Sequence, residues 1–217
     1  MKRQLLTAIL ASLILMGCGR YPKPTLIPSI PYTPDNIALV EKTLLSVGHI
    51  TGKTEEDGQI RSYGCTAFSI DVRKWMTAAH CVGLDMLIDG HPAMVIAASK
   101  EMDLAVLVAD YVRPALHIRV KPLVRQEEVI ALGYGMSWKF PTITHHFVMM
   151  LNYSPYDDIY PGTWYSNGFI GGQSGGPIID LTGQVVGVIQ RGDSQVGYGV
   201  NAAAILAFEQ STVVILD

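Results

Sequence analysis

One serine stands among glycines in the segment GQSGGP, residues 172–177. Glycine adopts backbone conformations that residues with a side chain avoid, so this segment can fold into a tight loop whose N–H groups point at one spot. A serine hydroxyl is a poor nucleophile unless a base and a place for negative charge lie beside it. The segment therefore predicts a tight loop that presents Ser174 as a candidate nucleophile.

Two upstream segments supply a candidate base, His80, and a candidate acid, Asp103. Asp85 and Asp89 lie closer to His80 along the chain, but both have the surroundings of turn residues. Asp103 is preferred because the apolar residues 104–107 follow it and would hold it rigidly at the start of a strand. The chain order His, Asp, Ser is one of the known orders of a hydrolytic triad.

Three motifs together resemble those of the trypsin-like (chymotrypsin-fold) serine peptidases. They are WMTAAHC at residues 75–81, DLAVL at residues 103–107 and GQSGGP at residues 172–177. The resemblance covers residues 44–208 and implies an all-β fold of two six-stranded antiparallel β-barrels with a short C-terminal helix. It also implies a serine endopeptidase that hydrolyses peptide bonds through an acyl-enzyme, with no cofactor and no metal.

The resemblance implies a role for each site residue. His80 would take the hydroxyl proton of Ser174 and return it to the leaving amine, while Asp103 would hold the histidine in the required tautomer. The N–H groups of Gly172 and Ser174 would line the oxyanion hole. The family's layout places the substrate pocket at Gly168, Gln190, Arg191, Gly192 and Gly199.

Gly168 and Gln173 depart from the pancreatic members of the family. Gly168 stands where trypsins keep an acidic residue, so we expect a small or apolar substrate preference rather than Lys or Arg. Gln173 replaces the aspartate that pairs with a newly cut N-terminus in the pancreatic enzymes. An amide cannot form that ion pair, so the bacterial HtrA-like relatives are nearer. We therefore expect activity without processing beyond signal removal.

The chain of 217 residues is long enough for a sizeable core, and we divide it into four parts. Residues 1–17 are typical of a signal peptide, and the prolines within residues 18–39 predict an extended tether. Residues 40–118 are the expected N-terminal barrel, and residues 119–217 are the expected C-terminal barrel with its terminal helix. We interpret the aromatic segment 153–165 as a loop.

A basic start and an apolar stretch at residues 5–16 precede Cys18, in a pattern that resembles the bacterial lipoprotein signal. Lipidation of Cys18 would anchor an exported chain to a membrane of the cell envelope without spanning it. The alternative is an ordinary secretory signal that ends near a cysteine.

The net charge is −3 and no basic run stands out, so nucleic acid is not an expected partner.

Cys65 and Cys81 are the remaining cysteines, and they lie sixteen positions apart. Export favours their pairing, and the spacing matches the disulfide that many chymotrypsin-like enzymes place beside the histidine. Two buried free thiols are the alternative.

His145 and His146 have no cysteine or paired carboxylates nearby, so we expect strand positions there rather than a metal site.

Two other functions fit the same motifs. A catalytically silent scaffold or binding protein would share the fold, and an esterase would share the mechanism. The intact set of His80, Asp103 and Ser174 weighs against the scaffold. A protein or peptide substrate is therefore the expected partner, and the sequence makes no prediction of the oligomeric state.

Overall fold

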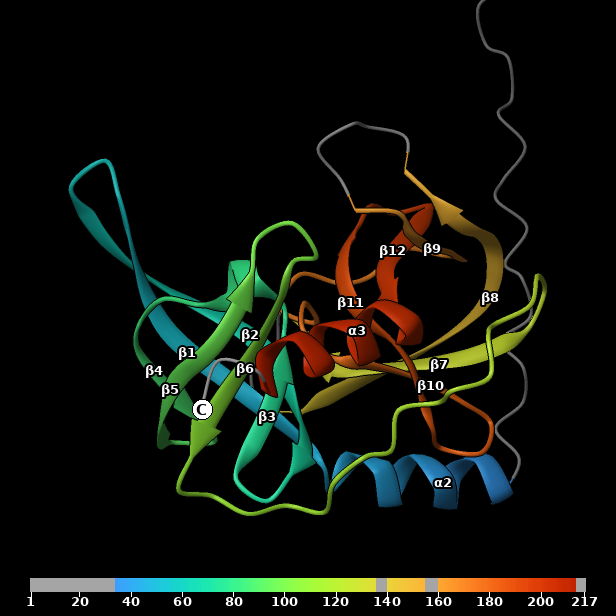
Figure 1. Ribbon diagram of the computed structural model, residues 1–217, viewed down its shortest axis with the longest axis horizontal. Coiled ribbons are helices and arrows are strands. Elements are labelled where there is room, and N and C mark those ends of the chain that lie inside the picture. Colours follow the sequence, from blue (N-terminus) through green and yellow to red (C-terminus); the bar gives the residue numbers. More distant parts are fainter. Residues whose placement is uncertain (1–33, 136–139, 155–159, 214–217) are drawn as a thin grey trace, which may run out of the picture. The chain divides into compact units, whose positions relative to one another are not determined.

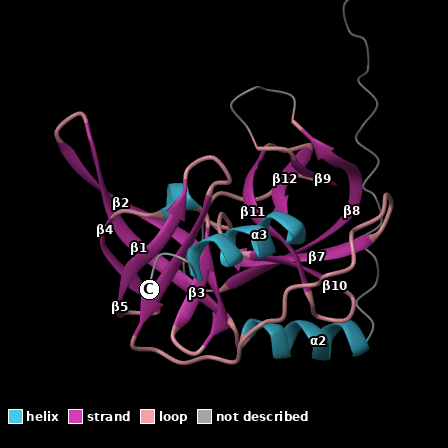
Figure 2. Cartoon of the chain, in the orientation of Figure 1, coloured by secondary structure: helices cyan, strands magenta, loops and turns pink. Residues whose placement is uncertain are grey.

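The computed structural model describes residues 34–135, 140–154 and 160–213, and strands dominate this part of the chain (Figure 2). The strands form two closed antiparallel barrels of six strands each, and a short helix follows them. The predicted all-β, chymotrypsin-like fold is therefore confirmed. None of the described helices is long and apolar enough to cross a membrane. The predicted signal segment and Cys18 lie outside the described residues.

The first barrel closes in the order β1-β2-β3-β6-β5-β4. Its strands are β1 (Val47–Glu56), β2 (Gln59–Asp71), β3 (Lys74–Thr77), β4 (Leu84–Ile88), β5 (His91–Ser99) and β6 (Leu104–Ala109). Strand β6 is apolar throughout because it lies between β3 and β5 and is buried along nearly all its length. Figure 1 shows β1 and β2 as a long hairpin that extends beyond the rest of this barrel.

The second barrel closes in the order β10-β11-β12-β9-β8-β7. Its strands are β7 (Glu128–Tyr134), β8 (Pro141–Tyr153), β9 (Gly162–Ser166), β10 (Pro177–Asp180), β11 (Val185–Gly192) and β12 (Val196–Asn201). The sequence prediction missed β9, because an aromatic stretch between turn-forming residues was interpreted as a loop. Tyr165 of β9 is fully buried, and the strand is required to join β8 to β12.

Two helices flank the barrels. Helix α3 (Ala202–Val213) begins where the Asn201 side chain accepts a hydrogen bond from the Ala204 N–H at 3.0 Å, which is a typical N-terminal cap. Helix α2 (Pro34–Leu44) was not predicted, and the expected end of the tether at residue 39 falls inside it. Proline fits the first turn of a helix, where its missing N–H has no partner to lose. Pro34 therefore begins a helix here.

A shared apolar core joins the two barrels. Phe68, Met76 and Val106 come from the first barrel, and Ile130 and Val188 come from the second. All belong to one cluster of buried side chains, which also includes residues of α2 and α3. The surface between the barrels is therefore part of the hydrophobic core, and it fixes one barrel against the other.

A buried arginine anchors the segment that connects the barrels. The backbone N–H of Arg119 donates a hydrogen bond to the Val185 carbonyl at 2.8 Å, which attaches the connecting segment to the start of β11. The Arg119 guanidinium bonds Glu127 and lies 3.1 Å from Asp180, and its side chain is only 9% exposed. The hydrogen bond from Arg119 lowers the pKa of the Glu127 carboxyl, which keeps the pair charged.

Candidate active site

Pairing of β3 with β6 brings His80 and Asp103 together. Thr77 ends β3 opposite Ala105 of β6, so the residues after β3 and before β6 share one edge of the barrel. His80 follows in the short 3-10 helix η1 (Ala79–Cys81). Its ring Nδ1 lies 2.8 Å from Asp103 Oδ2, and its backbone N–H donates to Asp103 Oδ1 at 2.9 Å. One carboxylate thus orients both the ring and the backbone of the histidine.

The two rival aspartates have other partners. Asp85 lies 2.8 Å from Lys53 in an exposed ion pair. Asp89 accepts a hydrogen bond from the His49 backbone N–H at 2.9 Å and lies 3.5 Å from Arg113. Among the described aspartates, Asp103 is the one that contacts the His80 ring.

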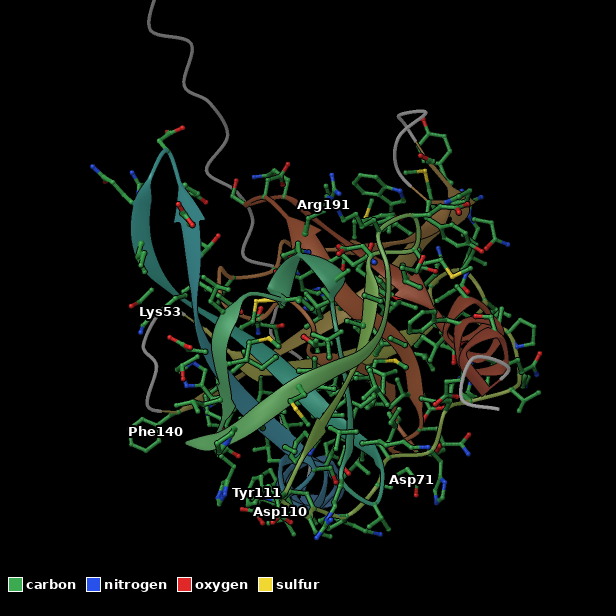
Figure 3. All side chains as sticks on the ribbon, turned by 60° about the vertical axis from the view of Figure 1, so that its left-hand side comes forward. Lys53, Asp71, Asp110, Tyr111, Phe140 and Arg191 are labelled. Carbon is green, nitrogen blue, oxygen red and sulfur yellow. A yellow bond between two sulfur atoms is a disulfide. The ribbon has the colours of Figure 1, made fainter. Side chains whose placement is uncertain are left out.

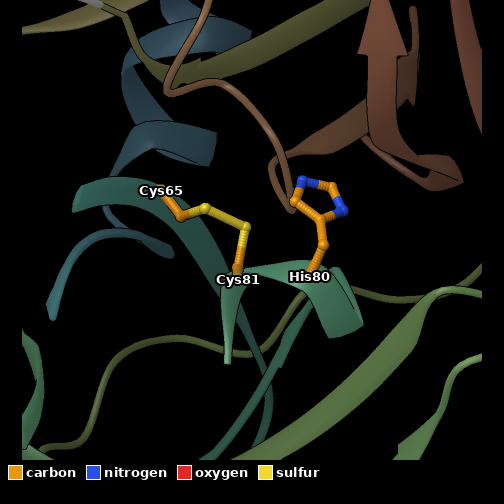
Figure 4. A group of neighbouring side chains, drawn as sticks. All are labelled: Cys65, His80 and Cys81. Atoms are coloured by element: carbon orange, nitrogen blue, oxygen red, sulfur yellow. A yellow bond between two sulfur atoms is a disulfide. The ribbon is translucent and has the colours of Figure 1, made fainter. Parts of the chain in front are cut away.

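The cysteine pair lies beside this histidine (Figure 4). Cys65 of β2 and Cys81 of η1 form a disulfide, so the predicted pairing is confirmed and the free-thiol alternative is wrong. The histidine nitrogen and both sulfurs lie within 4.8 Å of one another. The bond ties the turn that carries His80 to the neighbouring strand.

The candidate nucleophile lies on a loop of the second barrel that the first barrel holds in place. The Thr66 N–H of β2 donates to the Ser174 carbonyl at 2.9 Å. Gly175 has a φ of +81°, and a Cβ there would lie 2.1 Å from Thr77 Oγ1 and 2.3 Å from the Thr66 carbonyl oxygen. The loop can approach β2 this closely only because Gly175 has no side chain.

The Ser174 hydroxyl is directed at a backbone carbonyl in this structure. Ser174 Oγ donates to the Gln190 carbonyl oxygen at 3.0 Å. Within the described part of the chain, no hydrogen bond joins Ser174 to His80. The Ser174 hydroxyl would therefore have to leave the Gln190 carbonyl before it could bond His80.

The backbone on the other side of the serine offers unused donors. Gly172 has a φ of +93°, and its carbonyl accepts a hydrogen bond from the Thr66 hydroxyl at 2.9 Å. Among the described residues, the N–H groups of Gly172 and Ser174 have no backbone or side-chain acceptor. Two N–H groups of this kind can stabilise negative charge on a substrate oxygen.

The residue before the nucleophile is fully buried and hydrogen-bonded. Gln173 accepts a hydrogen bond from the Ile170 N–H at 2.8 Å and donates its amide N–H to the Thr142 hydroxyl at 3.2 Å. The Thr142 hydroxyl in turn donates to the Gly133 carbonyl at 2.8 Å. The side chain thus ties the loop to β7 and β8 without any ion pair, and the sequence motif did not indicate these partners.

Three of the predicted pocket residues are glycines that pack closely against neighbouring backbone. A Cβ at Gly168 would lie 1.2 Å from the Asp193 carbonyl oxygen, and one at Gly192 would lie 2.7 Å from the Phe169 nitrogen. A Cβ at Gly199 would lie 2.6 Å from the Val188 carbonyl oxygen. These glycines therefore permit close packing of neighbouring segments in this structure.

The other two predicted pocket residues, Gln190 and Arg191, line a hollow beside the histidine. Its further lining residues are Ala79, His80, Lys100 and Asp103. The Gln190 amide donates to the Met102 carbonyl at 2.6 Å and to the Asp103 carbonyl at 3.1 Å, so it also supports the backbone of the acid. The sequence reasoning missed Lys100, although it lies only three positions before Asp103.

The adjacent histidines of β8 lie at strand positions. His146 is fully buried, and its ring nitrogens bond the Ser166 carbonyl and the Thr144 hydroxyl. Burial lowers the pKa of His146 to about 4, so the ring is neutral at physiological pH. The cluster of potential metal ligands in the described residues is Cys65, Cys81 and His80, and its two sulfurs are bonded to each other.

Two six-stranded barrels with His80, Asp103 and Ser174 where they meet define a chymotrypsin-like protein. The sequence pattern of the trypsin-like peptidase domain matches residues 65–188, and the chain belongs to that family. A comparison with curated proteins found no match.

Solved structures of bacterial proteases share the fold. The active form of the Rv3671c protease from M. tuberculosis is 24% identical at a TM-score of 0.69, with 88% of this chain and 91% of that chain covered. The HtrA-type protease AlgW with a tripeptide is 20% identical at a TM-score of 0.69. There the match covers 81% of this chain and 62% of that chain, so this chain spans less than two thirds of AlgW.

Proposed function

We propose that this chain is a serine endopeptidase that cleaves peptide bonds through an acyl-enzyme on Ser174. The observation that carries the proposal is the His80–Asp103 pair, joined at 2.8 Å next to the glycine-rich loop of Ser174. Membership of the trypsin-like peptidase family supports the same reaction class.

Asp103 prepares His80 to act as a base. A carboxylate oxygen against Nδ1 holds the ring proton on that nitrogen, which leaves Nε2 as an acceptor. Nε2 takes the proton of the Ser174 hydroxyl and later returns it to the leaving amine. The second carboxylate oxygen, bonded to the His80 N–H, prevents rotation of the acid during this transfer.

Ser174 must leave the Gln190 carbonyl before it reacts. Rotation about its single side-chain torsion carries Oγ between staggered positions, and the proposal requires that one of them brings Oγ to His80. A bound substrate N–H would compete for the Gln190 carbonyl and favour that rotation. The oxyanion that forms next is stabilised by the Gly172 and Ser174 N–H groups, and removal of one such donor typically costs about 3 kcal/mol.

The edge of β11 beside Ser174 suits an extended substrate. Pairing of β11 with β10 ends at Val188, whereas pairing with β12 continues to Gly192. Residues 190–192 therefore extend beyond the neighbouring strand on the side of the serine. An extended peptide can add to such an edge by main-chain hydrogen bonds, which would hold its scissile carbonyl near Ser174.

Two further expectations belong to this proposal. Gln173 already has partners for its side chain inside the loop, which supports activity without N-terminal cleavage.

The disulfide supports an oxidising compartment, and Cys18 would attach the exported chain to an envelope membrane. Incorporation of radiolabelled fatty acid into the wild type, but not into Cys18→Ala, tests the anchor.

Labelling with a fluorophosphonate probe tests the nucleophile. The wild type should react, whereas Ser174→Ala and His80→Ala should not. Ser62→Ala removes an exposed hydroxyl on β2 and should label normally, which controls for nonspecific reaction. A folded wild type that stays unlabelled would favour the silent scaffold. A labelled enzyme that cleaves activated esters but no peptide would favour the esterase.

A further inference from the structure

We propose that the hollow beside His80 selects an acidic side chain, Asp or Glu, close to the cleaved bond of the substrate. Lys100 and Arg191 are the specificity-determining residues. The inference rests on the proposed peptidase function, and it replaces the small or apolar preference expected from Gly168 with an acidic one.

The hollow lies where a substrate side chain near the reacting atoms would enter. It has a volume of about 610 Å³, and its lining includes both His80 and Asp103. Lys100 lies in the turn between β5 and β6 of the first barrel. Arg191 lies near the end of β11 in the second barrel, where Figure 3 labels it at the surface of the molecule. Both barrels thus contribute one cation to the same space.

The two cations have no carboxylate partner in the described part of the chain. The exposed Lys100 and Arg191 form no ion pair there. Arg191 lies 6.0 Å from the centre of the Tyr198 ring, a contact that orients the guanidinium without neutralising it. The positive charge of the hollow is therefore available to a ligand.

Neighbouring acidic groups reduce this positive charge without removing it. Asp103 lines the hollow, and its carboxylate, which accepts hydrogen bonds from His80, offsets one of the two positive charges. The Asp193 carboxylate accepts the N–H groups of Gln195 and Val196 in its own turn. Glu101 is exposed beside Lys100 in sequence but does not line the hollow.

An acidic side chain also fits the rest of the site better than the alternatives. Gly168 and Gly192 offer a substrate no charged side chain, so selection by charge depends on the hollow. A peptide extended along residues 190–192 would pass Arg191 directly. A lysine or arginine side chain of a substrate would meet two like charges there. The same two charges that attract an acidic side chain therefore repel a basic one.

Paired fluorogenic peptides test the proposal on the full chain. The peptides carry Glu or the isosteric Gln at each of the four positions before the cleaved bond, and kcat/KM is measured for each pair. At low salt the wild type should cleave the best Glu peptide about fivefold faster than its Gln partner, since two exposed cations contribute modestly. The ratio should shrink in 0.5 M salt because exposed charges are screened.

Charge-removing variants identify the residues responsible. Lys100→Gln and Arg191→Gln should each reduce the Glu-to-Gln ratio by about twofold, and the double variant should bring it near one. Lys121→Gln removes an exposed lysine outside the hollow and should leave the ratio unchanged. Equal cleavage of Glu and Gln peptides by the wild type, or an undiminished ratio in the double variant, would overturn the proposal.

A binding measurement separates this proposal from the peptidase function itself. Fluorescence anisotropy with Ser174→Ala, which cannot turn over, should show tighter binding of the Glu peptide than of the Gln peptide. If the wild type cleaves no peptide but this difference is present, acid recognition stands and the peptidase proposal fails. If the wild type cleaves peptides and the difference is absent, the peptidase stands and acid recognition fails.

Discussion

The two barrels differ in how they position the residues that they contribute to the candidate site. In the first barrel, two hydrogen bonds join His80 of η1 to Asp103, which directly precedes β6. In the second, Ser174 depends on Thr66 of the other barrel for its backbone position, and its hydroxyl bonds Gln190. Strand pairing within one barrel thus brings His80 and Asp103 together, whereas the loop of Ser174 is positioned by contact between the barrels.

The largest expected effect comes from breaking the assembled pair of the first barrel. Asp103→Asn should reduce kcat by about 10⁴-fold, because an amide would present an N–H to Nδ1 and favour the wrong tautomer of His80. Steady-state assays on the best peptide measure the loss. Asp85→Asn changes an exposed aspartate of the same barrel and should retain full activity. Comparable losses in both variants would contradict the assignment of Asp103.

The second largest effect concerns the link between the barrels. Arg119→Ala should lower the free energy of unfolding by about 3–5 kcal/mol, because it leaves the Glu127 and Asp180 carboxylates buried without their cation. Urea denaturation followed by circular dichroism measures the change. Arg61→Ala removes an exposed ion pair with Glu56 and should cost less than about 1 kcal/mol. A loss that small in Arg119→Ala would show that the buried cluster is dispensable.

The third prediction uses pH to weaken the second barrel. The pKa of His146 is lowered by burial from 6.5 to about 4. Below pH 6.5 His146 is protonated in the unfolded chain, but in the folded protein it stays neutral down to about pH 4. The free energy of unfolding therefore falls as the pH is lowered across this window. The contribution is fully present above pH 6.5, and its loss amounts to about 3 kcal/mol.

His146→Gln should flatten this pH dependence of the denaturation midpoint, at the cost of lower stability at pH 7. His117→Gln is the control, because it changes an exposed histidine in the connection between the barrels and should leave the pH dependence unchanged. If the denaturation midpoint of His146→Gln depends on pH as strongly as that of the wild type, another group is responsible for the loss of stability in acid.

The smallest of the four effects is the loss of the disulfide in the first barrel. Cys65→Ser should lower the free energy of unfolding by about 3 kcal/mol or less, because cross-linking residues sixteen apart restricts the unfolded chain. Thermal denaturation with and without a reductant measures it. Reduction should destabilise the wild type and leave Cys65→Ser unchanged, and equal stability of all four samples would contradict a structural role.

Sequence patterns predicted the strands that alternate or run apolar, such as β1 and β6, because strand burial repeats at short range. They missed β9 and α2, whose assignments depend on distant partners and on the position of Pro34 in a first turn. In the site, motif order singled out His80, Asp103 and Ser174. It did not indicate that Ser174 bonds Gln190, which depends on a side-chain rotamer, or that Lys100 and Arg191 line one hollow, which depends on how the two barrels pack.

The close fit of Gly175 against Thr66 and Thr77 makes the position of the Ser174 loop, and with it the proposed activity, depend on the contact between the two barrels. A small parting of the barrels breaks the Thr66–Ser174 hydrogen bond while every strand ladder remains intact. On warming, turnover should therefore vanish before the far-ultraviolet signal declines.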